Sequence, residues 1–333
     1  MHADNIDIHT HIVPKHLPSF AGAVPSDWPS IEHTSCGHAN INISGKLFRT
    51  ITDAAWSVPR RIADIADMGI SRQAISPMPE LLSYWLPLDS AKALLRHVNE
   101  TIATMVTESP THMIGVGAVP LQDVDAAVAE LRRNVESLGL RAVEVGSNIN
   151  GVPIGDPCFE PFFEAAAALG VAVFVHALRA TGKERLVGPP MLEQIVGFPG
   201  EIALAAASLI TSGVLVRHPH LRIAFSHGGG GLAPMLARME HFWERIPKFS
   251  ELLQESPIST ARRAFYDLVV FEPVVVRTLV ELFGASQLLV ASDYPFGPYE
   301  RSPVDLLRRA GLSEADTMTI TQLNAPRFLR LLM

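Results

Sequence analysis

The stretch Ile6-Asp7-Ile8-His9-Thr10-His11 decides the fold, because it is a short apolar run that ends in two histidines. Alternate residues of a β-strand point to the same side, so His9 and His11 would face one cavity while Thr10 faces away. Three later apolar runs also end in residues of types that bind metals, and these last residues are His176, His227 and Asp293. Parallel β-barrels carry their sites at the carboxyl ends of their strands, so the pattern predicts a metal-dependent enzyme on such a barrel.

Short apolar strands alternate with helices along the chain, which indicates a parallel sheet buried on both faces. We predict eight strands, at residues 6–11, 73–76, 113–119, 141–146, 171–176, 223–227, 266–270 and 288–293. The helices predicted between them lie at residues 59–68, 89–108, 123–138, 157–169, 201–216, 233–243 and 273–283. Eight units, with no Gly-x-Gly-x-x-Gly motif after the first strand, favour a closed (β/α)8 barrel of the TIM type over an open doubly wound sheet. The predicted fold class is therefore α/β.

Residues 14–56 do not follow this alternation, since they are polar and punctuated by proline and glycine. Two short runs within them, 40–43 and 47–50, predict a hairpin. Loops that follow barrel strands at their carboxyl ends surround the site. We therefore expect a small lobe folded over the barrel mouth, as an insertion in one domain that spans 1–333.

Composition excludes several classes of protein. The chain has 333 residues, of which 48% are hydrophobic and 18% charged, and a net charge of −7. These values indicate a large buried core and argue against nucleic acid as a partner. Cys36 and Cys158 form no Cys-x-x-Cys pair, which excludes a disulfide framework and suits a reducing compartment. Without a basic-then-apolar leader or an apolar run of transmembrane length, we expect a cytoplasmic protein that does not bind a membrane.

The motifs at the strand ends resemble the amidohydrolase superfamily, and within it the branch of α-amino-β-carboxymuconate-ε-semialdehyde decarboxylase. The motifs that carry this resemblance are His9-Thr10-His11, Val173-Phe174-Val175-His176-Ala177, Phe225-Ser226-His227-Gly228-Gly229-Gly230 and Ser292-Asp293-Tyr294-Pro295-Phe296-Gly297. It extends over essentially the whole chain and includes Phe48-Arg49, Trp56, Ser83-Tyr84-Trp85 and Asn324-Ala325-Pro326-Arg327. The resemblance implies one divalent metal ion, usually zinc, held by His9, His11, His176 and Asp293.

The residue types agree with that ligand set. Three imidazoles and one carboxylate suit Zn²⁺ with one position left for water. Relatives with two metals bridge them with a modified lysine on the fourth strand, whereas 141–146 ends without a lysine, so we expect a single metal. Glu144 on that strand has two interpretations, a hydrogen-bond partner of a ligand histidine or a structural polar residue inside the barrel.

The resemblance also implies which residues handle protons and substrate. His227 would be catalytic without binding the metal, since a neutral imidazole beside an activated water can accept its proton. Asp293 would combine metal binding with proton transfer. Arg238 matches an arginine that such enzymes supply to the neighbouring subunit, where it would hold a substrate carboxylate, and this implies a homodimer. The alternative for Arg238 is an exposed arginine on the helix 233–243.

Two departures from the family pattern concern the substrate. Thr52 stands where these decarboxylases carry a second substrate arginine, and the tryptophan expected after the His176 strand is not found in 186–194. A dianionic substrate would be poorly held without that arginine, so we expect a substrate with one fewer carboxylate or a different aromatic acid. The candidate pocket residues at the barrel mouth are Arg49, Trp85, Phe296 and Tyr299, with core packing as their alternative role.

The leading prediction is a metal-dependent, non-oxidative decarboxylase of an aromatic or muconate-like carboxylic acid. The same residues could hydrolyse a lactone or an amide, or hydrate a double bond, because metal-activated water is common to these reactions. A binding protein that kept the barrel and lost its chemistry is a third possibility. The complete set of ligands together with His227 argues against it.

Overall fold

The computed structural model describes residues 4–18 and 26–331 of the chain. Its main sheet has eight parallel strands in the order β1 (Ile6–Ile12), β5 (Arg72–Pro77), β6 (Met113–Ala118), β7 (Ala142–Gly146), β10 (Ala172–His176), β11 (Arg222–Phe225), β12 (Phe265–Asp267) and β13 (Leu288–Leu289). The last strand region returns to the first: the N–H of Ile8 donates to the carbonyl of Val290 over 3.0 Å, and the N–H of Asp293 donates to the carbonyl of His9 over 2.9 Å. The predicted (β/α)8 barrel is confirmed.

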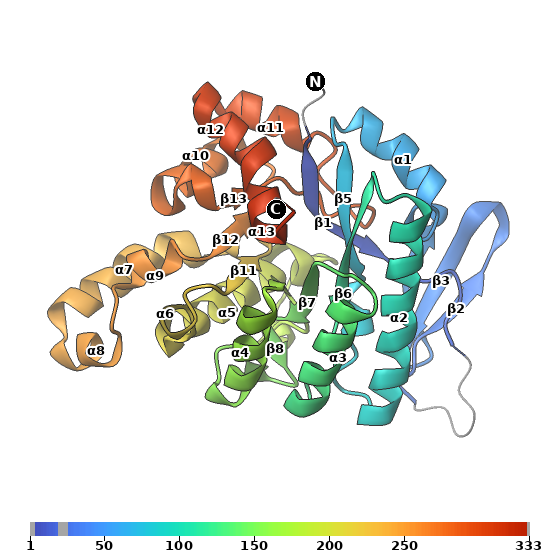
Figure 1. The fold of residues 1–333 in the computed structure, drawn as a ribbon, viewed down its shortest axis with the longest axis horizontal. Helices are drawn as coiled ribbons and strands as arrows, with labels where there is room; N and C mark the ends of the chain where they lie inside the picture. Colours follow the sequence, from blue (N-terminus) through green and yellow to red (C-terminus); the bar gives the residue numbers. More distant parts are fainter. Residues whose placement is uncertain (1–3, 19–25, 332–333) are drawn as a thin grey trace.

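Helices surround this barrel (Figure 1). Those that follow its strands are α1 (Val58–Asp67), α2 (Leu88–Glu108), α3 (Val124–Glu136), α4 (Glu160–Leu169), α5 (Phe198–Ser212), α7 (Leu232–Arg245) and α10 (Pro273–Phe283). Three more follow β13, namely α11 (Pro303–Ala310), α12 (Glu314–Met318) and α13 (Asn324–Leu329). The helix predicted at 201–216 is wrong in one respect, because Gly213 takes a positive φ of 79° and separates α5 from a short α6 (Val214–Arg217).

A β-bulge in β1 sets the direction of the two histidines. Asp7 pairs with Gln73 and Thr10 pairs with Ile75, so the strand contains one extra residue between these two pairs. Ile8 packs in the core cluster that includes Ala74, inside the barrel. The extra residue reverses the side to which the following side chains of the strand point. His9 and His11 can therefore project beyond that core, at the end of the barrel where the site lies. Bulges commonly redirect side chains in this way beside active sites.

The insertion after β1 forms a small antiparallel sheet of three strands, β2 (Ser30–His33), β3 (His38–Ile43) and β4 (Lys46–Thr52). The predicted hairpin corresponds to β3 and β4, and β2 is an additional strand. Ile41 and Ile51 of this sheet pack in one core cluster with Leu94 of α2 and Phe296. The lobe is therefore anchored beside the barrel, and Figure 1 shows it next to α2.

Two outer segments carry exposed apolar side chains. The continuous helical stretch Glu193–Ser212 is long and apolar enough to cross a membrane, a test that core helices of soluble proteins also pass. Its Ile202, Ala206 and Leu209 are buried, whereas its Ile195 is 63% exposed. The other segment consists of α7 and α8 (Pro247–Leu252), which extend away from the barrel in Figure 1.

Candidate metal centre

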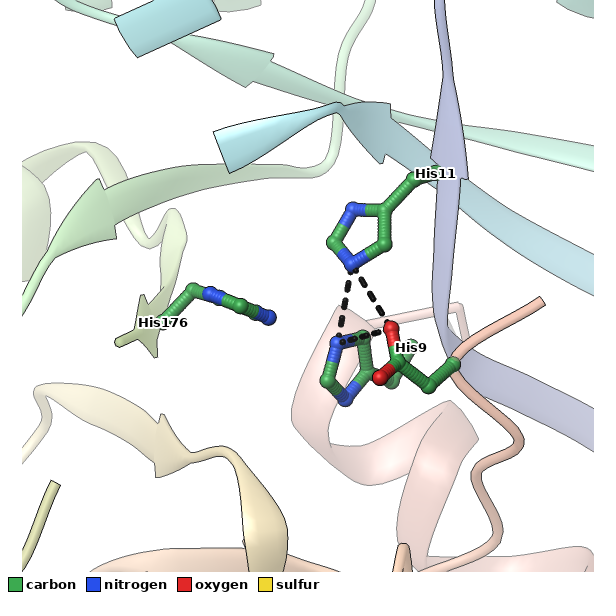
Figure 2. Close-up of side chains that lie close together, drawn as sticks. His9, His11 and His176 are labelled. Carbon is green, nitrogen blue, oxygen red and sulfur yellow. Dashed lines mark hydrogen bonds and ion pairs between the residues drawn. The ribbon is translucent and has the colours of Figure 1, made fainter. Parts of the chain in front are cut away.

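Four predicted ligands converge at the carboxyl end of the barrel. His9 and His11 come from β1, His176 is the last residue of β10, and Asp293 follows β13. The Nε2 atoms of His9 and His11 are 3.0 Å apart, and Asp293 Oδ1 lies 3.4 Å from the first and 3.1 Å from the second. One ligand atom from each of the four residues lies within 4.8 Å of all the others. Figure 2 shows the three imidazoles turned toward one another beside the carboxylate.

This arrangement fits a divalent cation. Metal–nitrogen bonds of about 2.0–2.1 Å in a tetrahedral site place ligand atoms roughly 3.3 Å apart. The three separations among His9, His11 and Asp293, from 3.0 to 3.4 Å, bracket that value, and the ligand atom of His176 lies within 4.8 Å of the other three. The Nε2 atom of His176 is buried and has no hydrogen-bond partner among the described residues, a state that a bound cation would relieve. The four residues therefore form a site for a divalent metal ion.

The second ring nitrogen of each ligand histidine, Nδ1, is hydrogen-bonded to a protein oxygen atom. His9 Nδ1 lies 2.6 Å from Asp267 Oδ2. His11 Nδ1 lies 2.9 Å from the carbonyl oxygen of Pro77, and His176 Nδ1 lies 2.8 Å from that of Ala177. Each of these oxygens accepts a hydrogen bond, so Nδ1 carries the proton and Nε2 presents its lone pair to the centre.

The local electrostatics favour the ligand forms of His176 and Asp293. Burial and the neighbouring rings of His9 and His11 hold the pKa of His176 well below its usual range, so this imidazole is neutral. Burial would raise the pKa of Asp293, but the imidazoles around it outweigh that effect and keep its pKa well below its usual range. A neutral imidazole and an ionised carboxylate are the forms that bind metal.

Glu144 lies behind His11. Its Oε2 atom accepts a hydrogen bond of 2.5 Å from the Ser76 hydroxyl and lies 3.7 Å from His11 Nδ1. Burial raises the pKa of Glu144 to about 7. Of the two interpretations from sequence, these contacts favour a partner that supports His11, acting through Ser76.

His227 stands beside the ligands without joining them. Its Nε2 atom is 3.8 Å from Asp293 Oδ2, beyond hydrogen-bond distance, and its side chain is 13% exposed. The turn that follows needs glycine, because Gly228 has a φ of +63° and a Cβ there would approach Val270 to 2.7 Å. An imidazole so placed can exchange protons with a molecule at the metal centre.

Asp267 links His9 to the His227 turn, and sequence reasoning did not single it out. While Oδ2 accepts from His9, Oδ1 accepts from the N–H of Gly228 over 3.0 Å and from that of Val269 over 3.2 Å. The side chain is fully buried. One carboxylate thus orients a metal ligand and fixes the backbone next to the candidate acid–base group.

Of the candidate substrate residues, Phe296 contacts a metal ligand and Arg49 contacts Phe296. Phe296 stacks on His11 with ring centroids 6.0 Å apart, and the Arg49 guanidinium lies 4.9 Å from the Phe296 ring. Trp85 lies under the Arg179 guanidinium, at 3.3 Å. The remaining candidate, Tyr299, packs edge-on against Tyr294. Thr52, at the position of the missing second arginine, is exposed at the end of β4.

Arg238 does not reach the metal centre of its own chain in the described structure. It is exposed on α7, and its guanidinium stacks on the ring of Phe242 at 4.9 Å. This position fits either interpretation from sequence, an arginine for a neighbouring subunit or an ordinary surface residue.

The chain belongs to the amidohydrolase family, whose profile matches residues 6–331. It is 34% identical to the 2-amino-3-carboxymuconate-6-semialdehyde decarboxylase of Dictyostelium discoideum, over 91% of this chain and 84% of that protein. The IDCase of Metarhizium anisopliae superposes with a TM-score of 0.83 at 21% identity, over 98% of this chain and 97% of that one. A dihydroxybenzoic acid decarboxylase of a Polaromonas species, solved with manganese and 2-nitroresorcinol, superposes with a TM-score of 0.70 at 24% identity, over 82% and 85% of the two chains.

Proposed function

We propose that this protein is a metal-dependent, non-oxidative decarboxylase of an aromatic or muconate-like carboxylic acid. The observation that carries the proposal is the position of His227, whose Nε2 lies 3.8 Å from Asp293 Oδ2 beside a complete four-ligand centre. His227 therefore provides a proton carrier next to a metal centre that can bind an anionic substrate. The similarity to the Dictyostelium decarboxylase supports this reaction over others that a metal centre of this kind can perform.

The reaction requires one proton and no oxidant. The carbon that bears the carboxylate gains a proton, its bond to the carboxylate carbon breaks, the electron pair of that bond remains with the protonated carbon's π-system, and CO₂ leaves. His227 and Asp293 would hold this proton, deliver it, and exchange it with solvent. A divalent cation in the site would supply positive charge that binds the anionic substrate and stabilises the developing negative charge.

Phe296 and Arg49 would select a flat, acidic substrate. Phe296 is buried beside His11 and presents an aromatic surface at the centre. Arg49 lies next to that ring, where its charge can pair with a carboxylate or a phenolate. With Thr52 at the position of a second arginine, the preferred substrate is a monocarboxylate such as a hydroxybenzoate.

A screen of carboxylic acids tests the reaction and its substrate together. We expect hydroxylated benzoates to release CO₂ faster than a muconate dicarboxylate does. Lactones and amides should remain intact under the same conditions. Water addition or hydrolysis without CO₂ from every compound in the panel would favour the hydrolase or hydratase alternative.

We propose zinc as the metal in the native protein. A ligand set of three imidazoles and one carboxylate supports zinc, whereas the manganese in the Polaromonas structure supports the other candidate. Elemental analysis of protein purified without added metal should give about one equivalent of zinc per chain. Manganese in its place, or two metals per chain, would refute this assignment.

We also propose that the protein functions as a homodimer. The segment formed by α7 and α8 exposes Met235, Ile246 and Leu252, of which Leu252 is 73% exposed, and Arg238 is exposed on α7. Burying such a face against a second copy would remove apolar surface from water. A two-fold contact there would bring the Arg238 of each chain toward its partner, where it could complete a substrate site.

Mixed dimers test this assembly. Arg238→Ala and His227→Ala proteins should each lose most of their activity, and subunit exchange should restore part of it, because one site of each mixed dimer contains neither defect. Sedimentation should give a dimer for each parent. Full activity in a dilute monomer, or no recovery after proven exchange, would contradict the proposal.

A further inference from the structure

Arg61 of α1 is buried to 0% exposure, which is unusual for an arginine. Its Nε atom donates to Gln73 Oε1 over 2.9 Å, and Nη1 donates to the carbonyl oxygens of His11 and Ala54 over 2.8 and 3.0 Å. Nη2 donates to Thr10 Oγ1 over 2.9 Å. Every acceptor of Arg61 among the described residues is an uncharged oxygen. Burial of a charge without a hydrogen-bonded counter-ion is costly, so this arrangement points to a specific role.

The segment that Arg61 holds is the one that carries two metal ligands. His11 is itself a ligand, and Thr10 lies between the two histidines on the opposite side of β1. This part of β1 follows the bulge, where the regular pairing to β5 has just been interrupted. A bulged strand has fewer ladder hydrogen bonds to fix it. Arg61 donates two hydrogen bonds to β1 at that point, to the His11 carbonyl and to Thr10 Oγ1, from outside the barrel.

Arg61 also contacts the segment that carries the carboxylate ligand, Asp293. Its guanidinium lies 4.8 Å from the centre of the Tyr294 ring, and Tyr294 directly follows Asp293. The Tyr294 hydroxyl donates to Asp64 Oδ2 over 2.8 Å, one turn further along α1. The Tyr294 carbonyl accepts the N–H of His11 over 2.7 Å. Helix α1 thus touches both ligand-bearing segments from behind.

This support matters because Asp293 has an unusual backbone conformation. Its φ of +68° lies in the left-handed region, which few residues other than glycine, asparagine and aspartate adopt. A shift of either segment would change the 3.1 Å separation of Asp293 Oδ1 and His11 Nε2. Metal sites tolerate only small displacements of their ligands.

We infer that Arg61 is a positioning residue of the metal centre, which holds His11 and Asp293 at their ligating distance by bonding β1 and packing on Tyr294 from outside the barrel. The role needs arginine, because a lysine offers one nitrogen in place of a planar fork with several donors. The inference rests on the metal site and is independent of which reaction the protein catalyses.

Metal affinity, rather than activity, provides the test. Arg61→Met keeps the apolar stem and removes the donors, and we expect its dissociation constant for Zn²⁺ to rise about 10- to 100-fold. In the Co²⁺-loaded protein, the visible absorption bands should shift, because they report ligand geometry. The Zn²⁺ affinity of Arg61→Lys should lie between that of Arg61→Met and that of the unchanged protein. Thr10→Val removes the acceptor of Arg61 Nη2 together with the 2.9 Å hydrogen bond that the Thr10 hydroxyl donates to the Ala74 carbonyl, and it should weaken Zn²⁺ binding about 2- to 10-fold.

Arg222→Met is the matched control. Arg222 is a half-buried arginine that also donates to backbone carbonyls, those of Phe328 and Gly170, but it lies at the first residue of β11, at the opposite end of the barrel. We expect this variant to melt at a lower temperature with unchanged Zn²⁺ affinity and Co²⁺ spectrum. The inference is refuted if the Arg61 variants behave in the same way. If Arg61→Met does not fold, unchanged Zn²⁺ affinity in both Arg61→Lys and Thr10→Val refutes it.

Discussion

Replacing Asp267 with asparagine should weaken metal binding more than it weakens the fold. The new side chain keeps one oxygen, which the N–H groups of Gly228 and Val269 would engage as they now engage Oδ1. Its NH₂ group would then face His9 Nδ1, which lies 2.6 Å from Oδ2 in the parent. A donor at that position requires Nδ1 to accept, so the ring proton moves to Nε2, the atom that must bind the metal.

The expected loss follows from this change of tautomer. Substitution of a partner that orients a ligand typically lowers metal affinity about 10- to 100-fold, or about 1.4–2.7 kcal/mol. Calorimetric titration of the metal-free protein with Zn²⁺ measures it directly. Compared with Asp267→Asn, Asp267→Ala should lower the melting temperature more and the Zn²⁺ affinity less. The melting temperature falls because the buried N–H groups of Gly228 and Val269 lose their acceptor.

A control for charge is Asp305→Asn, which removes a carboxylate from an exposed pair with Arg309 on α11 and should leave Zn²⁺ binding unchanged. Parent-like Zn²⁺ affinity in Asp267→Asn would show that this carboxylate does not set the tautomer of His9. The assignment of Nε2 as the ligand atom would then lose its main support.

Three further outcomes follow from the same structure. His176→Ala should fold but fail to retain stoichiometric metal after dialysis, since it removes a ligand atom; full metal content by elemental analysis would exclude His176 as a ligand. His227→Ala should retain the metal and lose activity about 10²- to 10⁴-fold, and loss of the metal instead would make His227 a ligand. The hydrogen bond from Arg217 lowers the pKa of Glu160 to about 2, so the pair stabilises the fold above about pH 4.5 and this contribution disappears as the pH falls toward 2. Glu160→Gln should therefore lower the stability of the metal-free protein by about 1–2 kcal/mol at pH 7, with a difference that shrinks on acidification; an equal difference at pH 7 and pH 3 in denaturant titrations would contradict this pKa.

The barrel and the ligand set could be predicted from sequence because both depend on local patterns. Each ligand ends an apolar run, and the ends of parallel strands meet at one edge whatever the distances in sequence. The final strand shows the limit of this reasoning. Its apolar run continues from Leu288 to Ala291, but β13 ends at Leu289, and the following residues bond to β1 in an irregular path.

The supporting residues could not be predicted in the same way. Asp267 ends β12 and so obeys the strand-end rule, but the apolar residues that follow it extend the predicted strand to Val270 and place Asp267 in its interior. Arg61 lies on a helix, where a charged residue predicts an exposed face. Its partners Thr10 and Gln73 are brought to it only by the packing of α1 against the bulged strand.

The most direct test of the proposed function is the reaction of the Zn²⁺-loaded protein with 2,6-dihydroxybenzoate and related hydroxybenzoates in D₂O. For a substrate that turns over, we expect equal amounts of CO₂ and of a product with one deuterium at the carbon that lost its carboxylate. A chelator should abolish the reaction, and added Zn²⁺ should restore it. Products that retain the carboxylate and gain water, or CO₂ release that a chelator does not affect, would contradict a metal-dependent decarboxylase.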